Sequence, residues 1–136
     1  VIIASLFAVA WYALDRDPPF QVLSYPKLEG RAGEYLRITA DVRRDAERNC
    51  DVVFSRYIYS SDGMTRYDIG TSYASADMIT ALELRTPGKL YSAILLPAAM
   101  APGPARLDIV LSYRCNKLHA FWPIVVTTSI PFTVLE

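Results

Sequence analysis

The segment LSYRCNKLHAFWPIVV, residues 111–126, places one of the chain's two cysteines near its only histidine. Cys115 and His119 are four residues apart, so on a loop they could act as a thiolate nucleophile and an imidazole base. A strand-like run precedes Cys115, however, and a second cysteine, Cys50, offers a disulfide partner. This context favours a disulfide over a reactive pair, and it leaves His119 as a loop residue.

Other chemical motifs give no support for catalysis. One histidine does not make a zinc site, and the sequence has neither a Gly-rich phosphate loop nor an EF-hand pattern. Lys plus Arg and Asp plus Glu each number 14, so no net field attracts nucleic acid. We therefore expect no enzyme activity, no cofactor or metal, no small-molecule substrate and no nucleic-acid partner.

Residues 1–14, VIIASLFAVAWYAL, form an uncharged hydrophobic segment that ends at Asp15. As a helix it would rise ~21 Å against ~30 Å of hydrocarbon, so preceding residues are expected to complete a membrane span. Trp11 and Tyr12 suit a membrane interface. A buried helix of a soluble protein and an uncleaved signal-peptide core are the alternatives. The expected anchor residues are Val1, Ile2, Ile3, Leu6, Phe7, Val9, Trp11, Tyr12 and Leu14.

The two cysteines bear on the compartment. Cys50 and Cys115 follow a hydrophobic anchor and form no CxxC motif, a pattern that favours a disulfide outside the cytoplasm. Closing so long a loop stabilises a fold by ~4 kcal/mol on the chain-entropy model. Two free buried cysteines are the alternative. We expect a single-pass membrane protein whose domain is periplasmic or extracellular.

After a stiff linker at residues 15–19, residues 20–136 are expected to form one β-rich domain. Period-2 alternation is clearest in residues 35–42, where Leu36, Ile38, Ala40 and Val42 face inward. Strand patterns occur in about seven segments, namely residues 20–25, 35–42, 50–60, 64–73, 90–97, 105–115 and 123–136. The pattern predicts an all-β, antiparallel β-sandwich.

Three local features interrupt the strands. The Ser61-Asp62-Gly63 turn joins two strands into a hairpin, and Arg56 breaks the apolar alternation, which indicates a bulge or a two-sided strand. Residues 75–84 predict one short helix, capped by Ser75, with Met78, Ile79 and Leu82 on one face.

The stretch LLPAAMAPGPARLDIVLSYRC, residues 95–115, resembles the Pro-Gly turn and penultimate strand of immunoglobulin-like or fibronectin-type domains, ending in Tyr-x-Cys. The resemblance is architectural and covers residues 20–136. It implies that the third and sixth strands are antiparallel neighbours, so that Cys50 and Cys115 meet at their shared end. The disulfide would then join two adjacent strands at the base of the loop of residues 116–122. Antibody-type domains differ, because their first cysteine lies on the second strand.

Two groups of side chains are candidates for partner binding. The loop group combines aromatic and basic residues, which are favoured at interfaces, although Phe121 and Trp122 could instead cap the open end of the core. For the hairpin group, which lies beside Arg66 and Tyr73, cross-strand pairing is an explanation that needs no ligand. The loop group is Lys117, Leu118, His119, Phe121 and Trp122, and the hairpin group is Arg56, Tyr57, Tyr59 and Tyr67.

Together these expectations describe a non-enzymatic, membrane-anchored accessory or structural subunit of a larger envelope or membrane complex. Its helix would lie in the lipid bilayer, and its exported Ig-like β-sandwich would dock on other protein subunits. An adhesion or soluble-ligand-binding module, or a membrane-associated bacteriophage structural component, are the alternatives.

Overall fold

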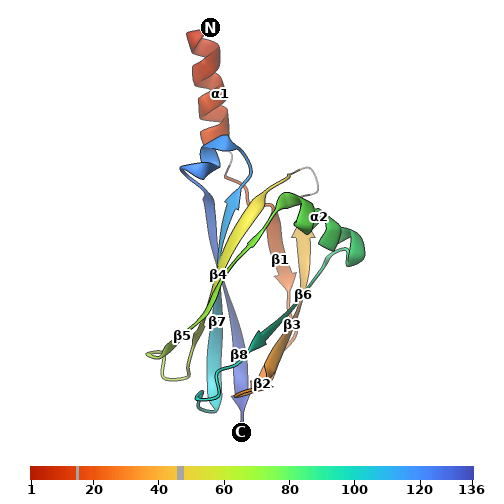
Figure 1. Ribbon diagram of the computed structural model, residues 1–136, viewed down its shortest axis with the longest axis vertical. Coiled ribbons are helices and arrows are strands. Elements are labelled where there is room, and N and C mark those ends of the chain that lie inside the picture. The colour runs from red at the N-terminus through yellow and green to blue at the C-terminus, as the bar shows by residue number, and fades with distance from the viewer. Residues whose placement is uncertain (15, 46–47) are drawn as a thin grey trace.

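An N-terminal helix and an elongated β domain make up the computed structural model, which describes residues 1–14, 16–45 and 48–136. Helix α1 stands at one end of the long axis and the C-terminus lies at the other (Figure 1). The elements are α1 (Ile2–Leu14), β1 (Phe20–Ser24), β2 (Glu29–Arg31), β3 (Tyr35–Arg44), β4 (Asp51–Tyr59), β5 (Arg66–Ala74), α2 (Ala76–Arg85), β6 (Lys89–Leu95), β7 (Gly103–Arg114), the 3-10 helix η1 (Lys117–Ala120) and β8 (Ile124–Leu135).

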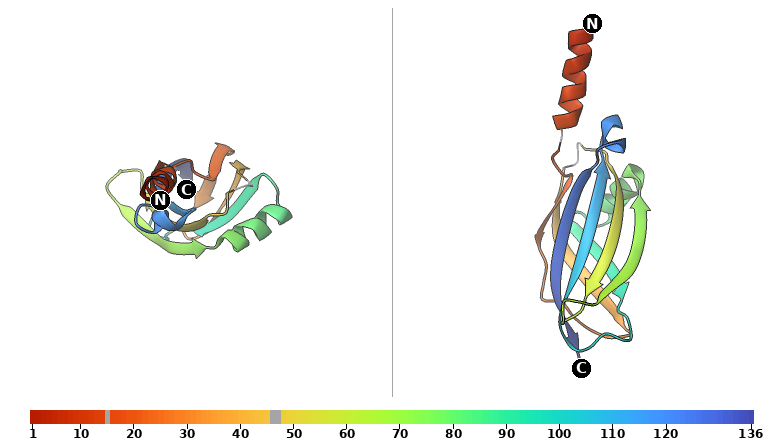
Figure 2. Two further views of the ribbon diagram at one scale, coloured as in Figure 1. Left: turned by 90° about the horizontal axis from the view of Figure 1, so that it is seen from above. Right: turned by 90° about the vertical axis from the view of Figure 1, so that its left-hand side faces the viewer.

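The strands form two facing sheets, seen from the side and from above in Figure 2. One sheet has the order β1-β3-β6 and the other β2-β8-β7-β4-β5. All neighbours pair antiparallel except β2 and β8, which are parallel. The predicted all-β fold with a short helix is therefore confirmed at the level of two packed sheets.

The core lies between the sheets because apolar side chains alternate along the strands. The inward residues expected in β3, Leu36, Ile38, Ala40 and Val42, are all buried. One apolar cluster joins Leu36 and Ile94 of the smaller sheet to side chains of the larger sheet. A second cluster, toward α1, contains Tyr113 and the disulfide.

The hairpin of β4 and β5 forms as expected, with Gly63 at a positive φ of 70°. Asp62 accepts hydrogen bonds from the backbone N–H groups of Met64 at 2.8 Å and Thr65 at 3.0 Å. An irregularity also lies at Arg56, where the pairing of β4 with β5 shifts between Arg56 and Tyr57, but it is not a bulge in β4 itself. The shift leaves the extra residue on the partner strand β5.

Helix α2 begins where predicted, but only one of the three residues expected on its apolar face is buried. The Ser75 hydroxyl accepts from the Met78 N–H at 3.3 Å, and the Asp51 carboxylate accepts from the Ala76 N–H at 2.8 Å. Ile79 is buried, whereas Met78 and Leu82 are 58% and 47% exposed. The sheets already cover most of each other, so the helix at their side buries only a narrow stripe.

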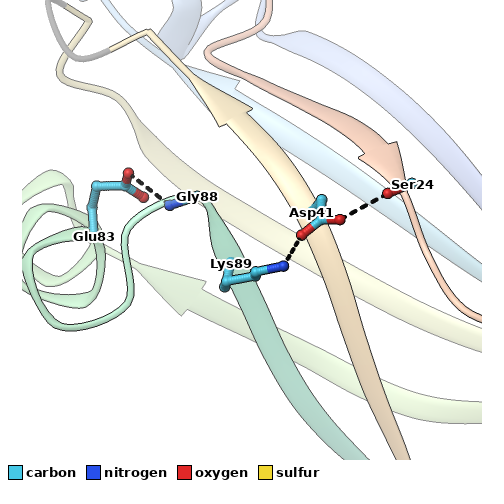
Figure 3. A network of polar contacts seen from close by, with 5 residues as sticks. All are labelled: Ser24, Asp41, Glu83, Gly88 and Lys89. Atoms are coloured by element: carbon cyan, nitrogen blue, oxygen red, sulfur yellow. Dashed lines mark hydrogen bonds and ion pairs between the residues drawn. The ribbon is translucent and has the colours of Figure 1, made fainter.

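On its outer surface the smaller sheet carries a polar contact that connects all three of its strands (Figure 3). Asp41 of β3 accepts a hydrogen bond from the Ser24 hydroxyl of β1 at 2.9 Å and pairs with the Lys89 ammonium of β6. These contacts, Lys89 first, hold the pKa of Asp41 below its usual value, and Asp41 raises the pKa of Lys89. Nearby, Glu83 accepts from the Gly88 N–H at 3.2 Å and closes the turn after α2.

The strand β2 and part of the linker differ from the sequence expectation. Residues 29–31, Glu-Gly-Arg, lack an apolar alternation, yet they pair with β8 and raise the strand number among the described residues to eight. In the expected linker, residues 16–19 have no regular helix or strand, and Asp15 lies outside the described residues.

Helix α1 has 13 residues without a charge, and the large side chains that the structure describes in it are exposed. Among the described residues, no helix reaches the combination of length and hydropathy that crossing a membrane requires. The side chain of Tyr12, expected at a membrane interface, lies outside the described part of the structure.

Candidate functional site

The disulfide fixes the end of the larger sheet nearest to α1. The Sγ atoms of Cys50 and Cys115 are bonded at 2.00 Å, one position beyond the paired residues Asp51 and Arg114. The bond therefore joins the neighbouring strands β4 and β7 within one sheet, as predicted. Because the Cys115 sulfur is in this bond, it is not a thiolate nucleophile in this structure.

The loop that follows Cys115 is organised by the polar side chain of Asn116. Its Oδ1 accepts from the backbone N–H groups of Leu118 at 3.0 Å and His119 at 3.2 Å, which caps the short helix η1. Such capping satisfies donors that a helix start otherwise leaves open. The loop is therefore a defined structure on which exposed side chains have fixed positions.

The side chain of His119 lies inside this loop and supports its backbone. Its side chain is only 1% exposed, and Nδ1 accepts a 2.9 Å hydrogen bond from the backbone N–H of Cys115. A buried donor without a partner would be costly, so this bond stabilises the junction between β7 and η1. His119 is therefore absent from the surface where the sequence suggested partner binding.

The remaining residues of the loop group face outward to different extents. Phe121 is 90% exposed and Trp122 is 58% exposed, while Lys117 is also exposed and Leu118 is half-buried. Phe121 and Trp122 consequently do not cap the core, which was the alternative suggested by the sequence. Neighbouring apolar side chains of this size at one loop tip are a candidate binding surface.

Arg16 holds the linker against this loop, a role that no sequence pattern indicated. Its guanidinium donates to the carbonyl oxygens of Trp122 at 2.6 Å and Pro123 at 2.7 Å. The same group lies 4.2 Å from the centroid of the Trp122 ring, a cation–π contact. The residues are 106 positions apart, so no local pattern could have indicated this contact.

The contact brings the base of α1 and the loop to the same end of the domain. Figure 1 shows η1 directly below α1, and α1 and η1 also contact each other. We call the combination of Arg16 and residues 116–122 the loop–linker joint. It is the part of the β domain that lies nearest to the apolar helix.

The hairpin group is divided between the two faces of the larger sheet. Tyr57 and Tyr59 lie on the outer face, with the Arg66 guanidinium 4.8 Å from the Tyr57 ring centroid and that of Arg106 4.3 Å from Tyr59. Cross-strand contacts with arginine therefore position both tyrosines on this face.

Arg56 and Tyr67 point to the other face. The Arg56 guanidinium lies 5.5 Å from the Phe54 ring centroid, and Tyr67 packs against the larger apolar cluster. These two residues therefore do not share a surface with Tyr57 and Tyr59.

Comparisons with known proteins assign no family to the chain. No family model matches it, and no curated protein matches it significantly. Among solved structures, the sensor domain of the anti-sigma factor RsgI4 from Pseudobacteroides cellulosolvens matches with a TM-score of 0.35 and 9% identity. That match covers 87% of this chain and 98% of the other. At this similarity, nothing about the sensor domain extends to the present chain.

Proposed function

We propose that this chain is a non-enzymatic, membrane-anchored accessory subunit of a larger envelope or membrane complex. The observation that carries the proposal is the exposed apolar surface of α1, which projects from the β domain (Figure 1). Removing apolar surface from water stabilises a structure by roughly 25 cal/mol per Å², and exposed side chains lack this free energy. Insertion into a bilayer, beside other membrane helices, removes this cost.

The proposal includes an Ig-like assignment of the β domain. It is supported by the strand orders β1-β3-β6 and β8-β7-β4, which correspond to A-B-E and G-F-C of that fold, while β5 and β2 extend the second sheet at its two edges. The antiparallel pairing of β4 and β7 is a second supporting feature. The disulfide lies within one sheet, in contrast to the inter-sheet disulfide of antibody domains.

Export of the domain is supported by the same disulfide. Disulfides persist in the periplasm and outside the cell, and they are rare where thiols are kept reduced. The disulfide thus supports a periplasmic or extracellular position of the domain, which is part of the proposal.

The outer face of the larger sheet is the proposed docking surface for another protein subunit. It presents Tyr57, Tyr59, Arg66 and Arg106, and tyrosine and arginine are enriched among the residues that dominate binding energy. The cation–π contacts hold these side chains in place before a partner arrives, which lowers the entropy cost of binding.

Copurification tests this function. The tagged full-length chain is alkylated in intact cells, recovered from washed membranes and purified in mild detergent together with its partners. Mass spectrometry under non-reducing conditions should find the Cys50–Cys115 peptide pair, and Tyr57→Ala should reduce recovery of a specific membrane partner. Tyr91→Ala is the matched control, because Tyr91 is exposed on the smaller sheet. Recovery in the soluble fraction, or alkylated free thiols, would overturn the proposal.

A further inference from the structure

The tip of the loop–linker joint carries two largely exposed aromatic rings, of which Trp122 has the Arg16 guanidinium against one face. Phe121 and Trp122 are adjacent in sequence and are 90% and 58% exposed. The disulfide, the Asn116 cap and the buried ring of His119 hold the backbone beneath them. The backbone that carries these rings is thus held at the surface of the domain, outside the core.

The distance between this tip and α1 is limited by covalent geometry. Arg16 follows the last residue of α1, Leu14, by two positions, and two extended residues span at most ~7 Å. Because Arg16 binds the Trp122 and Pro123 carbonyl oxygens, the loop cannot move far from the end of the helix. If α1 enters a membrane as far as Leu14, the aromatic tip is therefore close enough to contact that membrane.

The chemistry of the joint suits the polar layer of a membrane. This layer adds roughly 5–7 Å to each side of the hydrocarbon, which is comparable to the span from Leu14 to Arg16. Tryptophan is enriched at that depth because its ring is amphipathic, and cationic Arg16 and Lys117 can contact lipid phosphates. Lys117, Phe121 and Trp122 are exposed in this short segment, and half-buried Arg16 lies beside them.

We infer that Phe121 and Trp122 insert into the headgroup layer of the membrane that α1 enters, so that the lipid bilayer is the partner of this loop. The inference rests on the proposed function, because it requires α1 to be in a membrane. It adds a second attachment beside the helix. Two attachments restrict rotation of the domain, and they fix the direction in which the outer face of the larger sheet points.

The two tryptophans of the chain allow helix and loop to be examined separately. The full-length chain is reconstituted in vesicles of phosphatidylcholine and phosphatidylglycerol that contain brominated phosphatidylcholine. Bromine is placed either near the headgroup end or deep in the acyl chains. Trp11→Phe leaves Trp122 as the only indole, and Trp122→Phe leaves Trp11. Circular dichroism and the non-reducing peptide map show whether each variant is folded.

We expect Trp122 emission to shift to the blue on reconstitution and to be quenched more by shallow than by deep bromine. Trp11 should be quenched within the same vesicles. Quenching of Trp11 without quenching of Trp122 would overturn the inference and leave the proposed anchor intact. Absence of quenching at Trp11 would instead show failure of the proposed function. If Trp122 is shielded from aqueous acrylamide but is not quenched by the brominated lipid, it contacts protein instead of lipid. This result also overturns the inference.

The contribution of Arg16 is tested in the Trp11→Phe background. Arg16→Ala should shift Trp122 emission to the red and reduce its quenching, because the linker no longer holds the loop near α1. Arg37→Ala is the matched control, since Arg37 is exposed on β3 away from the joint. If Trp122 is quenched equally in the Trp11→Phe protein and in its Arg16→Ala and Arg37→Ala variants, Arg16 does not hold the loop at the membrane.

Discussion

The backbone N–H of Cys115 donates a 2.9 Å hydrogen bond to Nδ1 of His119, the residue whose spacing first suggested catalysis. The imidazole thus acts as a buried acceptor at a strand end, while the sulfur of Cys115 is bonded to Cys50. A pair of residues with reactive side chains is used here to build a loop. This arrangement has a measurable consequence for stability.

His119→Phe should lower the free energy of unfolding by about 1–3 kcal/mol, because the ring is retained but the Cys115 N–H loses its acceptor. Chemical denaturation under oxidising conditions measures the loss. Hydrogen exchange at the Cys115 amide should accelerate in the same variant. Lys117→Gln, an exposed change in the same short helix, should have little effect. An unchanged Cys115 amide would contradict the assigned role.

Removal of the disulfide by the double change Cys50→Ala and Cys115→Ala should cost about 4 kcal/mol, because the bond closes a loop with a sequence separation of 65. Urea unfolding of the oxidised protein and the double variant measures this difference. Addition of a reductant should destabilise the wild type and leave the variant unaffected. Equal midpoints for both oxidised proteins would count against the stabilising role of this bond.

Because of Asp62, the free energy of unfolding should change with pH in the acidic range. Hydrogen bonds from the Ser60 hydroxyl and from the backbone N–H groups of Met64 and Thr65 lower the pKa of Asp62 from 3.8 to about 2. The folded state therefore favours the carboxylate, whose contribution is complete above about pH 4 and is lost as the pH falls toward 2. Asp62→Asn should be less stable than wild type at pH 6, and the difference should shrink at pH 2.

The comparison for Asp62 is made by urea unfolding across this range. Glu34→Gln, which changes an exposed carboxylate, should follow the wild-type profile. A constant difference between wild type and Asp62→Asn at every pH would show that ionisation of Asp62 is not coupled to folding.

Tyr113 should make the protein sensitive to alkali. Burial raises the pKa of Tyr113 to about 12, against 10 in the unfolded chain. Between these values the unfolded state loses the proton first, so stability falls as the pH rises, by roughly 2–3 kcal/mol near pH 12. Tyr113→Phe should lack this part of the loss in denaturation experiments from pH 8 to 12. Tyr91→Phe, at an exposed position, should retain the wild-type slope.

Local patterns predicted the strands well because alternation is a property of each strand alone. Leu36, Ile38, Ala40 and Val42 were identified as inward from their spacing, and the Asp62-Gly63 turn follows from the backbone freedom of glycine. The disulfide position followed from the resemblance to an Ig-like domain, because that topology makes two distant strands neighbours.

The predictions that failed depended on tertiary context. Which residues of α2 are covered depends on where the helix meets the sheets, so Met78 and Leu82 could not be distinguished from Ile79 by periodicity. The hairpin group was placed on one surface because the sequence does not show that Tyr67 pairs with Ile58, which points inward. The role of Arg16 arises from a contact with the opposite end of the chain.

The parallel pair β2 and β8 also has a mechanical meaning. β2 is connected through β1 to α1 at one end of the molecule, while β8 ends at the other (Figure 1). Tension between α1 and the end of β8 would pull these two strands in opposite directions along their length. Their hydrogen bonds would then be loaded in shear, all at the same time, in contrast to a hairpin that unzips one bond after another.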